Sequence, residues 1–159
     1  MSDVTISYRS GDLLRAEERV IAHGCNMQGK MGRGVALAIS ERYPGALAAY
    51  MQHFEDGALA LGKVVHWKGA DRVVLNMITQ DRYGRGERFV DYDAVRTCFA
   101  RIDLWARTHL REARGFFHED PRLAIPMIGA DRGGGDWKVI EGIIREELVS
   151  IPVTVYRLA

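Results

Sequence analysis

The chain has 159 residues, of which 47% are hydrophobic and 27% charged, and its formal net charge is +1. This length and composition suit one domain, residues 1–159, with enough apolar material for a packed core. The even charge balance argues against a chain that binds nucleic acid or a membrane surface through its overall charge, although it is compatible with a local basic pocket.

The two cysteines, Cys25 and Cys98, form neither a CxxC motif nor a zinc-ligand spacing, and they are too few for a disulfide framework. The opening stretch MSDVTISYRSGD has no signal-peptide pattern, and no apolar run approaches the length of a membrane span. We therefore expect a reduced, cytoplasmic monomer that contacts no membrane and needs neither a metal nor a cofactor.

The first half of the chain alternates short apolar runs with helical patterns. These patterns predict strands at 4–8, 19–25, 62–67 and 72–79, and helices at 32–43 and 46–54. A glycine- and arginine-rich loop, QDRYGRGERFVD, follows the fourth of these strands.

The second half begins with a long helix predicted from about 91 to 113. Its apolar stripe roughly follows helical spacing and comprises Tyr92, Val95, Phe99, Ile102, Trp105 and Leu110. A buried strand at 122–128, a helix at 136–149 and a strand at 152–158 complete the chain. Strands with few polar positions that alternate with helices indicate an α/β layered fold around a central sheet, in which ligands bind at the carboxyl ends of the strands.

The stretch IGADRGGGDW, residues 128–137, joins a predicted buried strand to a helix with Asp136 as its N-cap. Glycines allow backbone N–H groups to approach a ligand closely, and a helix N-terminus adds partial positive charge. Together these features favour a phosphate-binding loop, although a flexible connection has the same composition.

A second loop, HGCNMQGKMGRGV, also leads from a buried strand through glycines into a helix. It matches neither GxGxxG nor GxxxxGK[ST], which excludes a standard Rossmann or P-loop motif. Two strand–glycine loop–helix units in one small domain indicate two phosphates, and hence a diphosphate. After the first strand, Asp12 is placed to accept a hydrogen bond from an amino group of a base, or to act as a turn residue.

Three stretches taken together resemble a macro domain: GDLL, IAHGCNMQGKMGRGVALAI followed by YP, and IPMIGADRGGGDW followed by VI and TVYRL. The resemblance covers essentially the whole chain in order. It is nearest to the branch that includes the yeast ADP-ribose-1″-phosphate phosphatase, the terminal ADP-ribose–glutamate hydrolase and the DarG antitoxin. It implies a three-layer α/β/α sandwich with a central mixed sheet and an ADP-ribose cleft at the strand ends.

Carried over residue by residue, the resemblance implies a role for each loop. Asp12 would bind the adenine amino group, with Leu13 beside it. The segments around the distal ribose and the diphosphate would use Gly29, Lys30, Met31, Gly32, Gly34, Val35, Gly129, Ala130, Arg132, Gly133, Gly134 and Gly135. Thr79, Gln80 and Tyr83 would form a loop near the distal ribose or the adenine, where Tyr83 is either a stacking residue or a surface aromatic.

The chain departs from the family pattern at two places. Catalytic members of the hydrolase branch carry a lysine where this chain has Gln80, and glutamine cannot act as a nucleophile or form a Schiff base. In the loop IGADRGGGDW, Ala130, Asp131 and Arg132 replace the expected Cys, Gly and Leu. A carboxylate at Asp131 would repel a diphosphate unless Arg132 offsets it, or it would orient a water as a general base.

Further charged and polar residues of the loops are candidates for roles at the site. His23 and Asn26 match residues near the distal ribose: His23 is either a proton carrier or a hydrogen-bonded strand histidine, and Asn26 would position a ribose hydroxyl or a water. Lys30 either neutralises phosphate or is solvated. The loop arginines would guide an anionic substrate to the cleft, or form a solvated charged loop, and they are Arg82, Arg85 and Arg88.

These observations lead to three hypotheses. The first is a hydrolase that cleaves a bond at the distal ribose of ADP-ribose, in an ADP-ribosylated protein or nucleic acid or in a 1″-phosphate, with His23, Asn26 and Asp131 as catalytic candidates. The second is a module that binds ADP-ribose without cleaving it, favoured by Gln80. The third is a macro fold that sequesters a different nucleotide.

Overall fold

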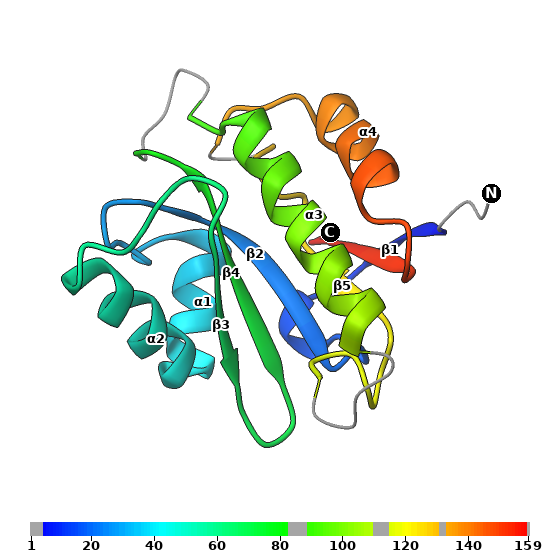
Figure 1. Cartoon of the computed structure of the whole chain (residues 1–159), viewed down its shortest axis with the longest axis horizontal. Helices are drawn as coiled ribbons and strands as arrows, with labels where there is room; N and C mark the ends of the chain where they lie inside the picture. The colour runs from blue at the N-terminus through cyan, green and yellow to red at the C-terminus, as the bar shows by residue number, and fades with distance from the viewer. Residues whose placement is uncertain (1–4, 83–88, 110–114, 131–132, 159) are drawn as a thin grey trace.

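The computed structural model describes residues 5–82, 89–109, 115–130 and 133–158. Within these residues, six strands form one sheet in the order β1-β6-β5-β2-β4-β3 (Figure 1). Every neighbouring pair is parallel except the β3–β4 hairpin, so the predicted mixed sheet is confirmed. The strands are β1 (Ile6–Ser10), β2 (Val20–Asn26), β3 (Val64–Lys68), β4 (Val73–Gln80), β5 (Leu123–Ile125) and β6 (Val153–Arg157).

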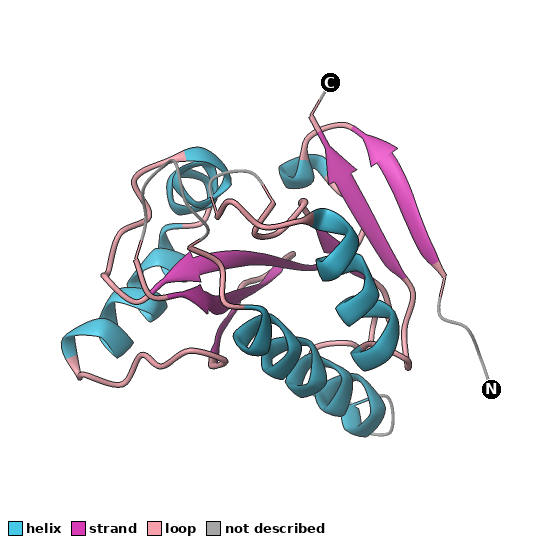
Figure 2. Cartoon of the chain, turned by 90° about the horizontal axis from the view of Figure 1, so that it is seen from above, coloured by secondary structure: helices cyan, strands magenta, loops and turns pink. Residues whose placement is uncertain are grey.

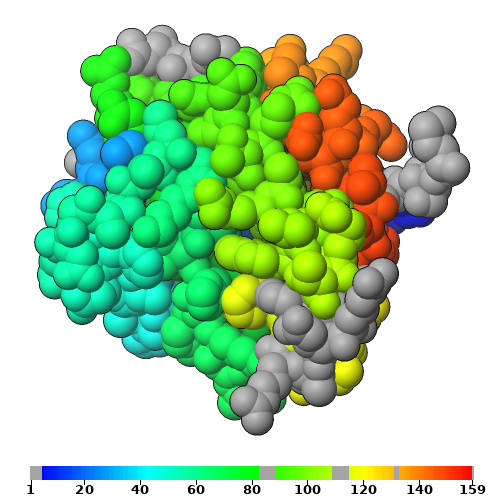
Figure 3. Space-filling view, viewed as in Figure 1, coloured from blue at the N-terminus to red at the C-terminus, as the bar shows by residue number. Residues whose placement is uncertain are grey.

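Helices cover both faces of the sheet, as the side view in Figure 2 shows. Helices α3 (Tyr92–His109) and α4 (Trp137–Glu147) lie on one face and cover much of it in the space-filling view of Figure 3, in which part of the β3–β4 hairpin is visible beside α3. Helices α1 (Gly34–Arg42) and α2 (Pro44–Glu55) and the short 3-10 helix η1 (Leu13–Arg15) lie on the other. This is the predicted three-layer α/β/α arrangement.

The central strands β2 and β4 are almost fully buried because both faces of the sheet are covered. Their side chains alternate between two cores: Val20 and Ala22 pack into the core under α3 and α4, and Ile21 packs into the core under η1 and α1. This alternation determines which side chains reach the carboxyl edge of the sheet and from which face.

Two elements differ from the prediction. The strand predicted at 122–128 ends at Ile125, since Pro126 has no N–H to donate to a ladder. Ile128 instead donates its N–H to the Pro126 carbonyl at 2.8 Å, which turns the chain away from the sheet. Helix η1 was not predicted, and Asp12 caps it by accepting a hydrogen bond from the Leu14 N–H at 2.9 Å.

Candidate functional site

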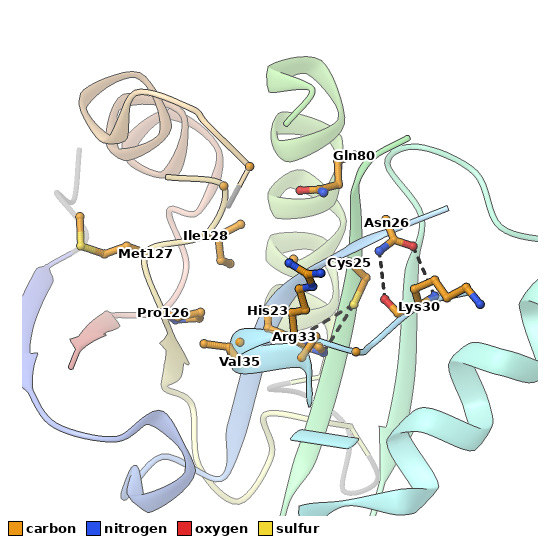
Figure 4. Close-up of a pocket in the computed structure, with 16 residues that line it drawn as sticks. His23, Cys25, Asn26, Lys30, Arg33, Val35, Gln80, Pro126, Met127 and Ile128 are labelled. Atoms are coloured by element: carbon orange, nitrogen blue, oxygen red, sulfur yellow. Dashed lines mark hydrogen bonds between the residues drawn. The ribbon is translucent and has the colours of Figure 1, made fainter. Parts of the chain in front are cut away.

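A pocket of about 320 Å³ lies at the carboxyl ends of β2, β4 and β5 (Figure 4). This is the edge at which open α/β sheets bind ligands. Its described lining contains two basic side chains and no carboxylate, and consists of His23, Gly24, Cys25, Asn26, Lys30, Gly32, Arg33, Gly34, Val35, Ala36, Gln80, Pro126, Met127, Ile128, Gly129 and Gly133. The pocket therefore favours an anionic ligand.

The loop after β2 is held in place by Asn26. The Asn26 Oδ1 accepts a hydrogen bond from the Gln28 N–H at 2.8 Å, and its Nδ2 donates to the Lys30 carbonyl at 3.0 Å. The Tyr50 hydroxyl, from α2, lies 2.6 Å from the Asn26 carbonyl and accepts the Gly29 N–H at 3.1 Å. Asn26 was expected to position a ribose hydroxyl or a water. In the structure, most of its hydrogen-bonding groups are used to hold the loop in place.

Helix α1 begins at the pocket without a side-chain cap. Arg33 occupies the N-cap position in an extended conformation and makes no capping hydrogen bond. Gly32 is exposed, and a Cβ at this position would meet nothing within 4 Å. The orphan N–H groups of the first turn, which carry the partial positive charge of the helix, are therefore not satisfied by a side chain.

The glycine loop that follows β5 is packed more tightly than the sequence indicated. Gly129 has a φ of +75°, and a Cβ there would lie 2.7 Å from a methyl carbon of Val90. Gly135 donates its N–H to the Gly129 carbonyl at 2.7 Å, and a Cβ on Gly133 would lie 2.7 Å from that same carbonyl oxygen. Small residues are needed here because the loop folds on itself and on Val90, and the Gly135 amide is not available to a ligand.

Helix α4 differs from α1 because its N-terminus is already capped. The Asp136 carboxylate accepts a hydrogen bond from the Lys138 N–H at 2.9 Å, as the sequence predicted. The Asp136 N–H is itself donated to the Tyr92 hydroxyl at 2.9 Å. The start of α1 is thus the more open of the two predicted anion sites.

His23 lies at the floor of the pocket and is 1% exposed. Its Nε2 lies 2.6 Å from the Asn76 Oδ1, and the Asn76 Nδ2 donates to the Ala46 carbonyl at 3.2 Å. Since Asn76 accepts through its oxygen, His23 carries its proton on Nε2. Burial lowers the pKa of His23 to about 4, so the expected proton transfer near neutral pH does not fit these surroundings.

Cys25 is packed, as the sequence indicated. Its side chain is 4% exposed and its Sγ lies 3.6 Å from the His23 Nε2. Burial raises the pKa of the Cys25 thiol well above its usual range, and a protonated thiol is a poor nucleophile.

Two predicted site residues at the end of β4, Gln80 and Thr79, lie in different surroundings. Gln80 lines the pocket, and its Nε2 donates to the Arg82 carbonyl at 2.7 Å, which leaves Oε1 as an acceptor. Thr79 is fully buried and does not line the pocket, and its Oγ1 has no hydrogen-bond partner among the described residues. A Cβ on Gly24 would lie 2.9 Å from that hydroxyl.

The segment expected to bind adenine lies after β1, at the far side of the sheet from β4. Arg72 holds this segment by donating to the carbonyls of Leu14 at 3.2 Å and Ala16 at 3.1 Å. Asp12 is exposed, Leu13 is 4% exposed, and neither lines the pocket.

Nine of the predicted site residues line the pocket: His23, Asn26, Lys30, Gly32, Gly34, Val35, Gln80, Gly129 and Gly133. Eight do not: Asp12, Leu13, Gly29, Met31, Thr79, Ala130, Gly134 and Gly135. The predictions for Tyr83, Asp131 and Arg132, like those for Arg85 and Arg88, lie outside the described residues.

Sequence reasoning missed part of the lining. Arg33 lines the pocket but was given no role in the prediction. The glycines on either side of it, Gly32 and Gly34, were both predicted to bind the ligand. Five further lining residues lie within the two long stretches that carry the resemblance but were given no role, and they are Gly24, Ala36, Pro126, Met127 and Ile128. The described ranges contain no group of three or more metal-ligating side chains, and no helix in them is long and apolar enough to cross a membrane.

Comparisons with known proteins agree with this architecture. The chain is 30% identical over 140 residues to the DNA ADP-ribosyl glycohydrolase of Mycobacterium tuberculosis, covering 86% of this chain but only 36% of that protein. It is 25% identical to the ADP-ribose 1″-phosphate phosphatase of Saccharomyces cerevisiae, covering 99% of this chain and all of that protein. The structure of a macrodomain protein from Streptomyces coelicolor matches with a TM-score of 0.74 and 32% identity, covering 97% of this chain and 99% of that one.

The family model for the Macro domain matches residues 22–144, which include most of β2, both glycine loops and most of α4. The matched segment contains every residue that lines the pocket. The chain therefore belongs to the Macro domain family.

Proposed function

We propose that this chain binds ADP-ribose, or an ADP-ribosyl group on a protein or nucleic acid, in the pocket at the strand ends. The observation that carries the proposal is the uncapped start of α1, which opens into a pocket whose described lining has no carboxylate. A phosphate group there would satisfy backbone N–H groups that no side chain caps.

The sheet order supports one direction for the ligand. Asp12 and Leu13 follow β1 at one edge of the sheet, whereas the pocket spans the ends of β5, β2 and β4. With the adenine at η1, the diphosphate reaches the start of α1, and the distal ribose lies over the ends of β2 and β4, near Asn26 and Gln80.

We further propose that the chain hydrolyses a bond at the distal ribose. The Mycobacterium tuberculosis and Saccharomyces cerevisiae relatives are named as a DNA ADP-ribosyl glycohydrolase and an ADP-ribose 1″-phosphate phosphatase, and both names describe hydrolases of ADP-ribosyl compounds. The chain spans about a third of the length of the mycobacterial relative, so the activity is proposed here for the macro domain alone.

In this proposal Gln80 orients a water molecule. A mechanism with a lysine nucleophile at this position would not require that role. With its Nε2 bound to the Arg82 carbonyl, its Oε1 accepts a hydrogen bond from a water and holds that water near the distal ribose. The water oxygen forms a new bond to the ribose carbon, the bond to the leaving group breaks, and the water proton passes to the leaving group or to solvent. Orientation by the anion-binding loop then contributes most of the rate enhancement.

Calorimetry with ADP-ribose, and with AMP as a control, tests the binding step. We expect ADP-ribose to bind more tightly than AMP, and Asp12→Ala to weaken it. Turnover is tested with ADP-ribose 1″-phosphate and with ADP-ribosylated protein and DNA, in the wild type and in Gln80→Ala. The absence of ADP-ribose binding would overturn the proposal.

A second candidate is a module that binds ADP-ribose and releases it intact. The observation that favours it is the lack of an acid or base poised for neutral pH among the described lining residues: His23 has a pKa of about 4 and the Cys25 thiol stays protonated. The same turnover assay separates the two candidates, because a binding module returns every conjugate unchanged after prolonged incubation.

We also propose that residues 1–159 act as one domain and as a monomer in the cytoplasm. The pairing of β1 with β6, which joins the two ends of the chain in one sheet, supports the single domain. The two free, buried cysteines fit a reducing compartment. Size-exclusion chromatography with light scattering tests the oligomeric state.

A further inference from the structure

Neither basic side chain of the pocket, Lys30 or Arg33, has a hydrogen-bond or ion-pair partner for its charge among the described residues, and Arg33 differs from Lys30 in direction, because Lys30 points away from the space that Arg33 faces (Figure 4). The guanidinium makes no hydrogen bond or ion pair with any residue in the part of the chain that the structure describes. Its side chain extends from the start of α1 toward the space between the 126–129 segment and the ends of β2 and β4 (Figure 4). An unpaired guanidinium directed into a pocket is well suited to bind an anionic group of a ligand.

The surroundings of Arg33 make its charge effective. Its wall of the pocket contains His23, which burial keeps neutral, and the packed thiol of Cys25. On the opposite wall lie Pro126 and Ile128, which add no charge. The described lining thus holds two positive charges and no negative one, in a chain whose net charge is only +1.

The position of Arg33 along the pocket points to one part of the ligand. The adenine segment follows β1, and β6 and β5 separate it from β2 in the sheet. In Figure 4 the Arg33 side chain points toward the ends of β2 and β4, where Asn26 and Gln80 line the same pocket. In the proposed pose this is the distal-ribose end, and the backbone of α1 is left to bind the diphosphate.

We propose that Arg33 is a specificity-determining residue that favours ligands with a phosphomonoester on the distal ribose over ligands that end in a neutral hydroxyl. This proposal rests on the proposed function, because it assumes that the pocket binds ADP-ribose. The planar guanidinium makes two parallel hydrogen bonds to a terminal phosphate, which a ribose hydroxyl cannot accept in the same way.

The test compares two ligands, ADP-ribose and ADP-ribose 1″-phosphate, in displacement of a fluorescent ADP-ribose analogue. Stopped-flow mixing reads the affinity in the first seconds, before turnover. We expect Arg33→Ala to weaken ADP-ribose 1″-phosphate about tenfold and ADP-ribose by less than about threefold. Arg33→Lys, which keeps the charge but loses the fork, recovers part of the preference.

Arg42→Ala is the matched control, because Arg42 lies in the last turn of the same helix and does not line the pocket. It should leave both affinities within about twofold of the wild type. An equal loss of affinity for both ligands in Arg33→Ala would place the guanidinium on the diphosphate and overturn the inference. Unchanged affinity for both ligands would also overturn it. Failure of wild-type protein to bind ADP-ribose at all would overturn the proposed function as well, so the two failures are distinguishable.

Discussion

The hydroxyl of Tyr50, on α2, lies 2.6 Å from the backbone oxygen and 3.0 Å from the side-chain oxygen of Asn26, at the end of β2. The same hydroxyl accepts the Gly29 N–H at 3.1 Å. One fully buried phenol therefore joins the helical layer to the loop that forms the rim of the pocket.

Tyr50→Phe tests whether this contact shapes the site. Loss of the hydroxyl removes a hydrogen bond from the buried Asn26 carbonyl and one from the half-buried Gly29 N–H, so we expect the free energy of unfolding to fall by about 1–3 kcal/mol. We also expect ADP-ribose affinity to fall several-fold, because the loop is no longer held. Urea unfolding and calorimetry measure the two effects.

Tyr43→Phe is the matched control for this prediction. Tyr43 also loses one hydrogen bond, from the Arg72 Nε at 3.0 Å, but it does not line the pocket. It should reduce stability but leave ligand affinity unchanged, because Arg72 keeps its hydrogen bonds to the carbonyls of Leu14, Ala16 and Glu18. Wild-type affinity in Tyr50→Phe would show that the loop keeps its shape without the phenol.

Thr79→Val tests the unpartnered hydroxyl behind Gly24. Valine has nearly the same shape and removes a buried polar atom, so the free energy of unfolding should rise by about 1 kcal/mol. Thr108→Val, which removes an exposed hydroxyl bonded to the Leu104 carbonyl, should give no such gain. A fall in ADP-ribose affinity in Thr79→Val would instead show that the hydroxyl reaches the ligand.

Gly129→Ala and Gly32→Ala separate the two reasons for glycine in the loops. Gly129 has a positive φ and a Cβ there meets Val90, so its substitution should cost about 2–3 kcal/mol of stability. A Cβ on Gly32 meets nothing, so that variant should fold normally but bind ADP-ribose less well, because the methyl group enters the ligand space. Equal stability of the two variants would contradict this distinction.

His23 predicts a pH dependence of stability. Burial lowers its pKa from 6.5 to about 4, so below pH 6.5 the unfolded chain binds a proton that the folded chain does not. Stability should therefore fall as the pH drops from 6.5 to 4, by about 3 kcal/mol in total from this group, and the loss should be absent above pH 6.5. Urea unfolding of wild type and His23→Gln at pH 7 and pH 4 measures it, and the same pH slope in both proteins would refute it.

Much of the fold could be predicted because its signals are local. The buried runs of β2 and β4 and the helical stripe of α3 through Val95, Phe99 and Ile102 depend on residues close together in the chain. The glycine loops and the Asp136 cap are likewise local, so the position of the pocket at the strand ends followed from the element order. The early end of β5 was also marked locally, by Pro126, although the prediction extended the strand beyond it.

The sequence by itself determined which segments form strands and helices, where the chain turns, and that glycine-rich loops follow β2 and β5. Only the tertiary structure decided which polar groups of those loops remain available to a ligand. The Asn26 backbone oxygen accepts a hydrogen bond from Tyr50, 24 residues away. The Nε2 of His23 is bonded to Asn76, 53 residues away, and burial keeps the ring neutral. A polar group that already makes a hydrogen bond is less available to a ligand, whether its partner is near or far in the sequence. Periodicity and spacing therefore locate a site, but long-range packing determines which atoms in it bind.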